Sequence, residues 1–275
     1  MNEWDKRNDY YSKTFVLFEI VKGMHGREVC FLPSKVNLGG DRKATPVRCI
    51  KAHSLDYLYK NFKAFAFYDK PYNIYSSVAG FENMPMFSYS PKIRKEQQNE
   101  FFNNSFTSYW TSYDFVLDID NNSLKEAYKD TKSIKLIFDV LKIPYSLRFS
   151  GMHGFHFVVR DPLFFSKPLL LIDKVKLCET IASNIKSIED IQSIDLSIYQ
   201  PQRVLKVPYS LGGGLNVCLP LSDSQFDSFE VENMHVEEVL KNINLKGRGL
   251  LEREFNNSKT SNSCEALINM YGVEL

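Results

Sequence analysis

The stretch Ser112–Ser123, SYDFVLDIDNNS, ends an apolar run with two carboxylates one residue apart. The run is short and is closed by the turn-forming pair Asn-Asn, which predicts a β-strand. Side chains alternate along a strand, so Asp118 and Asp120 share one face. Like charges side by side repel and raise each other's pKa unless a cation is held between them. The pair therefore predicts either a cation site or a solvated strand end that leads into a helix cap.

The composition is that of a well-packed globular protein, because 44% of the 275 residues are hydrophobic and 14% are aromatic. The 34 Lys and Arg nearly balance 33 Asp and Glu, so the net charge of +1 does not itself indicate a nucleic-acid-binding protein. A local basic groove is compatible with this balance. No apolar run approaches the roughly 18 residues of a membrane span, and the polar start is unlike a signal peptide. We expect an intracellular protein, in the cytoplasm or nucleoid, without membrane contact.

The five cysteines are scattered, odd in number and without a CxxC pair. This usage predicts buried thiols in a reducing compartment. His25, Cys30, Cys49 and His53 could be drawn as a zinc site. Cys30, however, falls inside the strand-like segment REVCFLP, and the spacing is not a usual ligand pattern. We expect no zinc.

The order of elements is clearest after Asp114. The acid-bearing strand is followed by the capping-box signal Ser123-x-x-Glu126, which predicts a helix. The elements expected after that helix are a strand at YSLRF (145–149), a turn at SGMHG, a strand at FHFVVR (155–160), a helix over 169–188 and a strand at SIDLSIY (193–199). The order β-α-β-β-α-β is that of an RRM-like, split βαβ sheet.

The first 110 residues predict a mixed module. The segments expected to be extended are SKTFVLFEI (12–20), REVCFLP (27–33), PVRCIKAH (46–53) and PYNIYSSVAGF (71–81). A helix running into a strand is expected at 54–68, and a helix or an exposed connection at 90–108. The α/β (α+β) fold then has an N-terminal module (10–110) packed on an RRM-like catalytic module (111–225) within one domain over 1–255. A polar linker (NNSKTSNS, 256–263) opens the C-terminal segment 256–275.

The turn between the second and third strands of the RRM-like unit predicts an anion site. In this topology the first and third strands are commonly neighbours, which brings Asp118 and Asp120 near the turn. Ser150, Gly151 and Gly154 can present a hydroxyl and backbone N–H groups to an anion, because glycine lets the backbone approach closely. His156 could donate to a phosphate oxygen. The alternative is an ordinary hairpin turn.

Asp195 is the third acid. It lies between apolar residues, where an unpaired carboxylate would be costly. Arg203 and Lys206 follow, in reach of a polyphosphate if their segment borders the same face. Three carboxylates beside phosphate-binding groups are sufficient for phosphoryl or nucleotidyl transfer with two Mg²⁺ or Mn²⁺ ions. Spacing alone does not separate a polymerase from a nuclease.

The joint order of these motifs resembles the archaeo-eukaryotic primase superfamily, in particular the small catalytic subunit of archaeal and eukaryotic DNA primases. FVLDID resembles the first motif, SGMHGFHFVV the second, IDLSIY the third and RVLKVPYSL the downstream R-x-x-K-x-P-x-S segment. Upstream strands resemble the family as well, so the likeness spans roughly residues 25–221.

The resemblance implies catalytic and metal-binding roles for Asp118, Asp120 and Asp195. It further implies nucleotide-binding roles for Ser150, Gly151, Gly154, His156, Arg203 and Lys206, with Arg48 as a weaker candidate for contact with the template or the initiating nucleotide. The implied activity is primer synthesis on single-stranded DNA from NTPs or dNTPs, with a primase large subunit as partner.

The sequence also departs from the family. Gly212 stands where a histidine is common, the usual HGKTG loop is reduced to GGGL, and no zinc-binding cysteine cluster is present. Met152 and His153 occupy two positions inside the second motif that are arginine-like in the family. Two other functions stay open: a primase-polymerase relative that extends primers in repair or in a plasmid, viral or CRISPR system, and a non-catalytic nucleic-acid-binding subunit. The intact set of acids disfavours the second, because packed carboxylates repel phosphate.

Overall fold

The computed structural model of the chain describes residues 2–24, 26–33, 47–51, 72–82, 91–165, 167–245 and 261–272. The strands in these ranges are β1 (Arg27–Pro33), β2 (Val47–Lys51), β3 (Tyr72–Phe81), β4 (Trp110–Tyr113), β5 (Phe115–Asp120), β6 (Ser146–Phe149), β7 (Gly154–Val159) and β8 (Val204–Lys206). The α-helices are α1 (Glu3–Ser12), α2 (Thr14–Met24), α4 (Pro91–Asn104), α5 (Leu124–Val140), α6 (Asp161–Phe164), α7 (Leu171–Ile188), α8 (Asp223–Asp227), α9 (Val236–Leu245) and α10 (Ser261–Tyr271). The 3₁₀ helices are η2 (Phe106–Tyr109), η3 (Leu196–Tyr199), η4 (Gly213–Leu215) and η5 (Val231–Met234). The elements expected at 54–68 and most of the expected linker at 256–263 lie outside the described residues.

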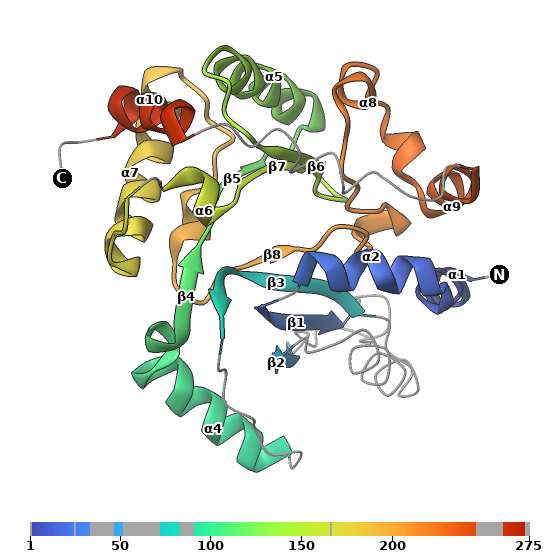
Figure 1. Cartoon of the computed structure of the whole chain (residues 1–275). Coiled ribbons are helices and arrows are strands. Elements are labelled where there is room, and N and C mark those ends of the chain that lie inside the picture. The colour runs from blue at the N-terminus through green and yellow to red at the C-terminus, as the bar shows by residue number, and fades with distance from the viewer. Residues whose placement is uncertain are drawn as a thin grey trace.

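The strands form two antiparallel sheets (Figure 1). The first sheet has the order β2-β1-β3-β4, and β8 also pairs with β3. The second sheet has the order β5-β7-β6, with helices α5 and α7 packed on its outer side. An isolated antiparallel bridge joins Ile119 to Ile194 and adds a minimal fourth strand beside β5. The predicted RRM-like order is therefore present, and the other side of this sheet looks toward β3 and β8.

Two expected extended segments have a different structure. SKTFVLFEI is helical, because Val16, Leu17, Ile20 and Met24 form one buried face of α2 at helical spacing. Its β-branched and aromatic residues suit a strand locally, so packing overrides propensity here. SIDLSIY forms only the bridge at Ile194 and then the short helix η3, for which Asp195 is the N-cap.

The second sheet packs on an apolar core beneath α5, in which the ring centroid of Phe138 on α5 lies 5.2 Å from that of Phe157 on β7. Leu117 and Ile119 point inward from β5 and are fully buried. Of the predicted capping box at the start of α5, one of the two hydrogen bonds forms: the Ser123 side chain accepts from the Glu126 N–H at 3.4 Å.

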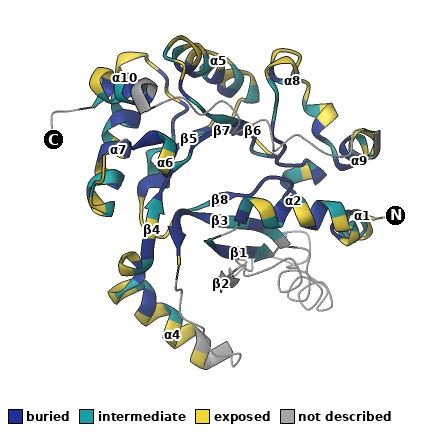
Figure 2. Cartoon of the chain, in the orientation of Figure 1, coloured by how far each residue is buried: buried dark blue, intermediate teal, exposed yellow. Residues whose placement is uncertain are grey.

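Buried residues concentrate along both sheets and the inner faces of their helices, whereas α4 is mostly exposed (Figure 2). No described helix combines the length and the apolar character that crossing a membrane requires.

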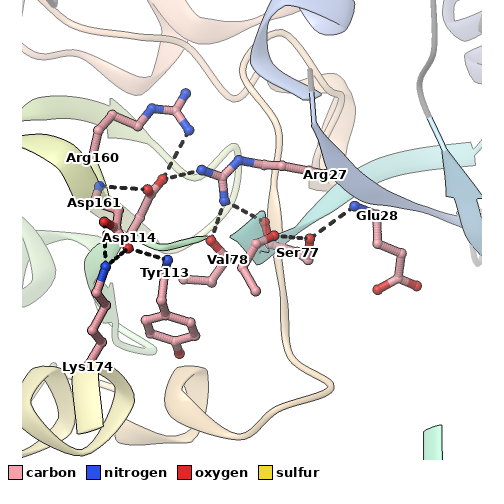
Figure 3. Close-up of polar contacts among 10 residues, drawn as sticks. Arg27, Glu28, Ser77, Val78, Tyr113, Asp114, Arg160, Asp161 and Lys174 are labelled. Carbon is pink, nitrogen blue, oxygen red and sulfur yellow. Dashed lines mark hydrogen bonds and ion pairs between the residues drawn. The ribbon is translucent and has the colours of Figure 1, made fainter. Parts of the chain in front are cut away.

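A buried ion network joins the two sheets (Figure 3). The Arg27 guanidinium, on β1, donates to the carbonyl oxygens of Ser77 and Val78 on β3 and lies 2.5 Å from the Asp114 carboxylate. Asp114 directly precedes β5 and also accepts from Arg160 Nη1 at 3.0 Å. Arg27 and Asp114 are both nearly inaccessible to solvent. The strand that carries the two predicted metal-binding acids is thus tied at its start to the first sheet.

Candidate nucleotide and metal site

Four polar residues form a row across the second sheet. In the strand register Asp118 on β5 pairs with His156 on β7, and His156 pairs with Arg148 on β6. On the other edge, the bridge between Ile119 and Ile194 sets Asp195 opposite Asp118, and the Asp195 N–H donates to the Asp118 carbonyl at 2.8 Å. Opposite residues in antiparallel strands share a face. The row is therefore Asp195, Asp118, His156 and Arg148.

Asp120 lies two residues beyond Asp118 on the same face, as predicted, and pairs with Gly154 of the hairpin. Its side chain is exposed, whereas about a fifth of the Asp118 side chain, 21%, reaches solvent. The Asp195 carboxylate accepts hydrogen bonds from Ser197 N and Ser197 Oγ, both at 2.8 Å. The three predicted acids thus lie on neighbouring backbone positions.

Charge repulsion is concentrated on Asp118. Burial, followed by the charges of Asp120 and Asp195, raises the pKa of Asp118 to about 7, although Arg148 and Lys206 act in the opposite direction. A cation held among the three carboxylates would relieve this repulsion. The donor set consists of carboxylate oxygens, which suit Mg²⁺ or Mn²⁺. Within the described ranges, no group of three or more Asp, Glu, His or Cys side chains is already arranged to hold a metal ion. The three carboxylates therefore fit by chemistry and backbone placement, and their side chains would have to turn toward a common point.

His156 is held between a cation and an acid. Arg148 Nε donates to His156 Nδ1 at 3.1 Å, and His156 Nε2 lies 3.4 Å from Asp118 Oδ1. Burial, together with the charges of Arg148 and Lys206, keeps the pKa of His156 well below its ordinary value, so the ring is neutral near pH 7. Because Nδ1 accepts, Nε2 carries the proton and faces Asp118. Sequence reasoning missed Arg148, although its position two residues before Ser150 in a strand places it on the His156 face.

The hairpin between β6 and β7 is tightly closed. Ser150 Oγ accepts from the N–H groups of Met152 at 3.3 Å and Gly154 at 3.1 Å, while Gly151 adopts a φ of +82°. The Gly154 N–H, which we expected to face an anion, is therefore turned toward the serine oxygen. The serine proton is not used in these two bonds and can be donated outward.

Lys206 and Arg203 occupy different environments. Lys206 lies on β8 opposite Tyr75, is nearly buried, and has its Nζ 5.7 Å from the Tyr75 ring centroid. Burial lowers its pKa, and the charges of Cys218, Asp118 and Asp120 act against that lowering. Lys206 thus lies within electrostatic reach of the acids from the opposite sheet. Arg203 precedes β8, is exposed, and donates to Gln200 Oε1 at 3.3 Å.

Arg48 is held by contacts within the protein, and Cys30 is buried. The Arg48 guanidinium lies on both carboxylate oxygens of buried Glu28 at 2.9 and 2.7 Å, donates to the Gln202 carbonyl and covers the Phe102 ring. A template contact by Arg48 would compete with these partners. Burial raises the pKa of Cys30 to about 12, so its thiol is protonated at neutral pH. His25, His53 and the Cys49 side chain lie outside the described residues.

Comparison with known proteins places this architecture in one class. The chain has the mixed α/β fold of a polymerase domain, which confirms the fold class expected from the motifs. One similar solved structure is the polymerase domain of ligase D from Mycobacterium tuberculosis, determined in complex with DNA. The TM-score is 0.58 at 13% sequence identity, and the match covers 90% of this chain and 91% of that chain. No family model and no curated protein matches the sequence.

Proposed function

We propose that the protein is a template-directed nucleotidyltransferase acting on DNA, with primer synthesis on single-stranded DNA as its principal activity. The observation that carries this proposal is the row Asp195, Asp118, His156 and Arg148, which faces Lys206 on the opposite sheet. Acids on one wall and a cation on the other suit a triphosphate bridged to metal ions. The ligase D polymerase domain, solved with DNA, has the same overall fold. The proposal includes that the protein acts as the small catalytic subunit of a primase and that a large subunit is its partner.

In this reaction the 3′-hydroxyl of one nucleotide attacks the α-phosphate of the next, a phosphodiester forms and pyrophosphate leaves. Asp118, Asp120 and Asp195 would hold two Mg²⁺ or Mn²⁺ ions, which when bound supply charge neutralisation at the attacking and leaving oxygens. Lys206 neutralises part of the triphosphate charge from the first sheet. The Ser150 hydroxyl donates to a phosphate oxygen. The neutral His156 ring orients the Asp118 carboxylate through its Nε2 proton. Because Nδ1 accepts from Arg148, a direct phosphate contact by His156 would require the ring to give up one of these partners.

A second candidate is primer extension without chain initiation. The polymerase domain of similar fold described above is part of a ligase, which favours extension of existing ends over starting new ones. The two candidates share every residue of the site and differ only in the need for a pre-existing 3′-hydroxyl. Substrate choice therefore separates them.

The test is incubation of the purified chain with labelled NTPs or dNTPs and Mn²⁺ or Mg²⁺, on unprimed and on primed single strands. Products on the unprimed strand, alone or after addition of a large subunit, support primer synthesis. Products on the primed strand only support the extension reading. Absence of product from every combination, together with retained DNA binding, would favour a non-catalytic binding subunit.

Removal of the Ser150 hydroxyl or of the His156 ring is expected to slow turnover on a pre-annealed primer. Ser150→Ala and His156→Ala each remove a preorganised polar group next to developing negative charge, so we expect a loss of about 10²–10³ in kcat. The matched control is His153→Ala, since His153 is exposed on the same hairpin. If His156→Ala weakened only template binding and left kcat intact, the nucleotide-binding role of His156 would be wrong.

A further inference from the structure

The segment that follows Lys206 forms a loop of unusual backbone conformation. Tyr209 and Leu215 both have φ of +65°, a region that side chains other than glycine rarely adopt, and Gly212, Gly213 and Gly214 lie between them. The loop is closed by backbone bonds from Tyr209 N to Cys218 O at 2.7 Å and from Gly212 N to Asn216 O at 2.6 Å. Three successive glycines offer no side chains to fix the loop, so its position depends on contacts from elsewhere.

This loop, residues 209–215, forms the wall behind the Ser150–Gly154 hairpin. A Cβ added at Gly212 would overlap the carbonyl oxygen of Gly151, so the two backbones are in direct contact. A Cβ at Gly151 would lie 3.2 Å from Cys218 N, and one at Gly213 would lie 3.3 Å from Met152 Cγ. The loop and the hairpin are closely packed at Gly151, Gly212 and Gly213. A shift of the loop therefore shifts the hairpin.

Helix α1 holds the loop through three buried hydrogen bonds. Arg7 Nη2 donates to the Gly212 carbonyl at 3.0 Å, and the Tyr10 hydroxyl donates to the Tyr209 carbonyl at 2.9 Å. The Tyr11 hydroxyl accepts from Leu211 N at 2.9 Å. Positions 7, 10 and 11 follow the i, i+3, i+4 spacing of one helical face. Arg7 also donates to Asn73 Oδ1 on β3 at 3.0 Å, which fixes the helix to the first sheet.

We propose that α1 is a positioning element of the nucleotide site: Arg7, Tyr10 and Tyr11 hold the 209–215 loop, and the loop fixes the Ser150–Gly154 hairpin against which the triphosphate lies. The inference rests on the proposed function for its kinetic consequence, whereas the mechanical coupling stands independently of it. An apolar helix face would bury the same area. A polar face instead supplies one acceptor and two donors to backbone groups that would otherwise be buried without partners.

The test compares two tyrosines whose hydroxyls each donate to a backbone carbonyl, one in α1 and one in α5. Tyr10→Phe deletes a hydroxyl that donates to a carbonyl at 2.9 Å, and Tyr128→Phe, on α5, deletes a hydroxyl that donates to the Phe226 carbonyl at 2.9 Å. Both variants should lower Tm by a few degrees, Tyr10→Phe by at least as much as Tyr128→Phe because Tyr10 is fully buried. We expect only Tyr10→Phe to lower kcat/KM for the nucleotide, by about 10-fold to 100-fold, because misplacement of a binding group is costly. Tyr11→Phe is the second variant and should act in the same direction.

Hydrogen exchange at the Met152 and Gly154 amides gives a readout that needs no activity. We expect both amides to exchange at least about tenfold faster in Tyr10→Phe than in Tyr128→Phe, since they report closure of the hairpin. Unchanged protection in Tyr10→Phe would overturn the coupling. Selective loss of protection in a protein that transfers no nucleotide would retain the coupling and reject the proposed function. Equal kinetic effects of Tyr10→Phe and Tyr128→Phe would reject the positioning role.

Discussion

The Asp118→Asn/Asp120→Asn double variant is expected to lose nucleotidyl transfer completely and, without metal, to melt at a higher temperature than the wild type. Transfer is lost because amides are poor ligands for Mg²⁺ or Mn²⁺ in place of two of the three carboxylates. Stability rises because burial disfavours the charged form of Asp118 and, in the absence of a cation, Asp120 and Asp195 repel it; both causes raise its pKa.

The stability gain depends on pH with a definite sign. The pKa of Asp118 is about 7 in the folded protein against an ordinary value near 4. Between these pH values the folded protein holds a proton that the unfolded chain has lost, so wild-type stability falls as pH rises from about 4 to about 7. An asparagine side chain does not titrate. The single variant Asp118→Asn should therefore gain on the order of 2 kcal/mol at pH 8, after allowance for its exposed fifth, and little at pH 4.5.

Calorimetry in EDTA at pH 8 and at pH 4.5 measures the gain in stability, and a primer-extension assay measures the loss of transfer. Asp227→Asn is the matched control, since Asp227 is an exposed carboxylate on α8. Normal product yield from the double variant would contradict the catalytic role of the acids. An equal gain at both pH values would show that ionisation of the buried Asp118 beside two acids is not the cause of the stabilisation.

The second large effect is expected at the ion network between the sheets. Asp114→Ala should lower the free energy of unfolding by about 3–5 kcal/mol, because it leaves the buried Arg27 guanidinium without its carboxylate. The matched control is Asp9→Ala, which breaks an exposed pair with Lys13 at 2.7 Å and should cost less than about 1 kcal/mol. Urea unfolding with a common m-value measures both.

A double variant separates loss of packing from an unpaired charge. Arg27→Met in the Asp114→Ala background removes the isolated cation, so we expect it to recover part of the stability lost in Asp114→Ala alone. A further loss of stability in the double variant would show instead that Arg27 acts mainly through its bonds to the β3 carbonyls of Ser77 and Val78.

The sequence was sufficient to predict the RRM-like half of the fold, because its signals are local. The alternation in FVLDID, the cap at Ser123 and the apolar face of α7 each specify one element without reference to the rest of the chain. The segment 12–20 was wrongly predicted as extended, since its helical face is satisfied only by packing on the first sheet. The pairing of β8 with β3 joins Lys206 to Tyr75, and no local pattern encodes such a contact.

In the candidate site, too, the backbone positions were predictable from the sequence and the side-chain contacts were not. Asp118 and Asp120 were predicted to lie near the SGMHG turn and do so, because the strand order makes β5 and β7 adjacent and antiparallel pairing brings their facing ends together. Two features of the site depend on side-chain rotamers that the sequence does not specify. Asp195 caps a short helix, and Ser150 Oγ accepts from N–H groups of its own hairpin. The roles of the nucleotide-binding residues remain predictions for the variants described above.

The bond from Tyr10 to Tyr209 joins positions 199 apart in the sequence, and this separation bears on how the chain acquires its site during synthesis. On the ribosome, β5 to β7 can form their own sheet and set the acids side by side before β8 has emerged. Lys206, the glycine loop and the support from α1 come together only when the later segment returns to β3 and α1. Contacts of such long range form slowly. A nascent chain therefore carries its acidic wall for some time before Lys206 and the 209–215 loop are in place opposite it.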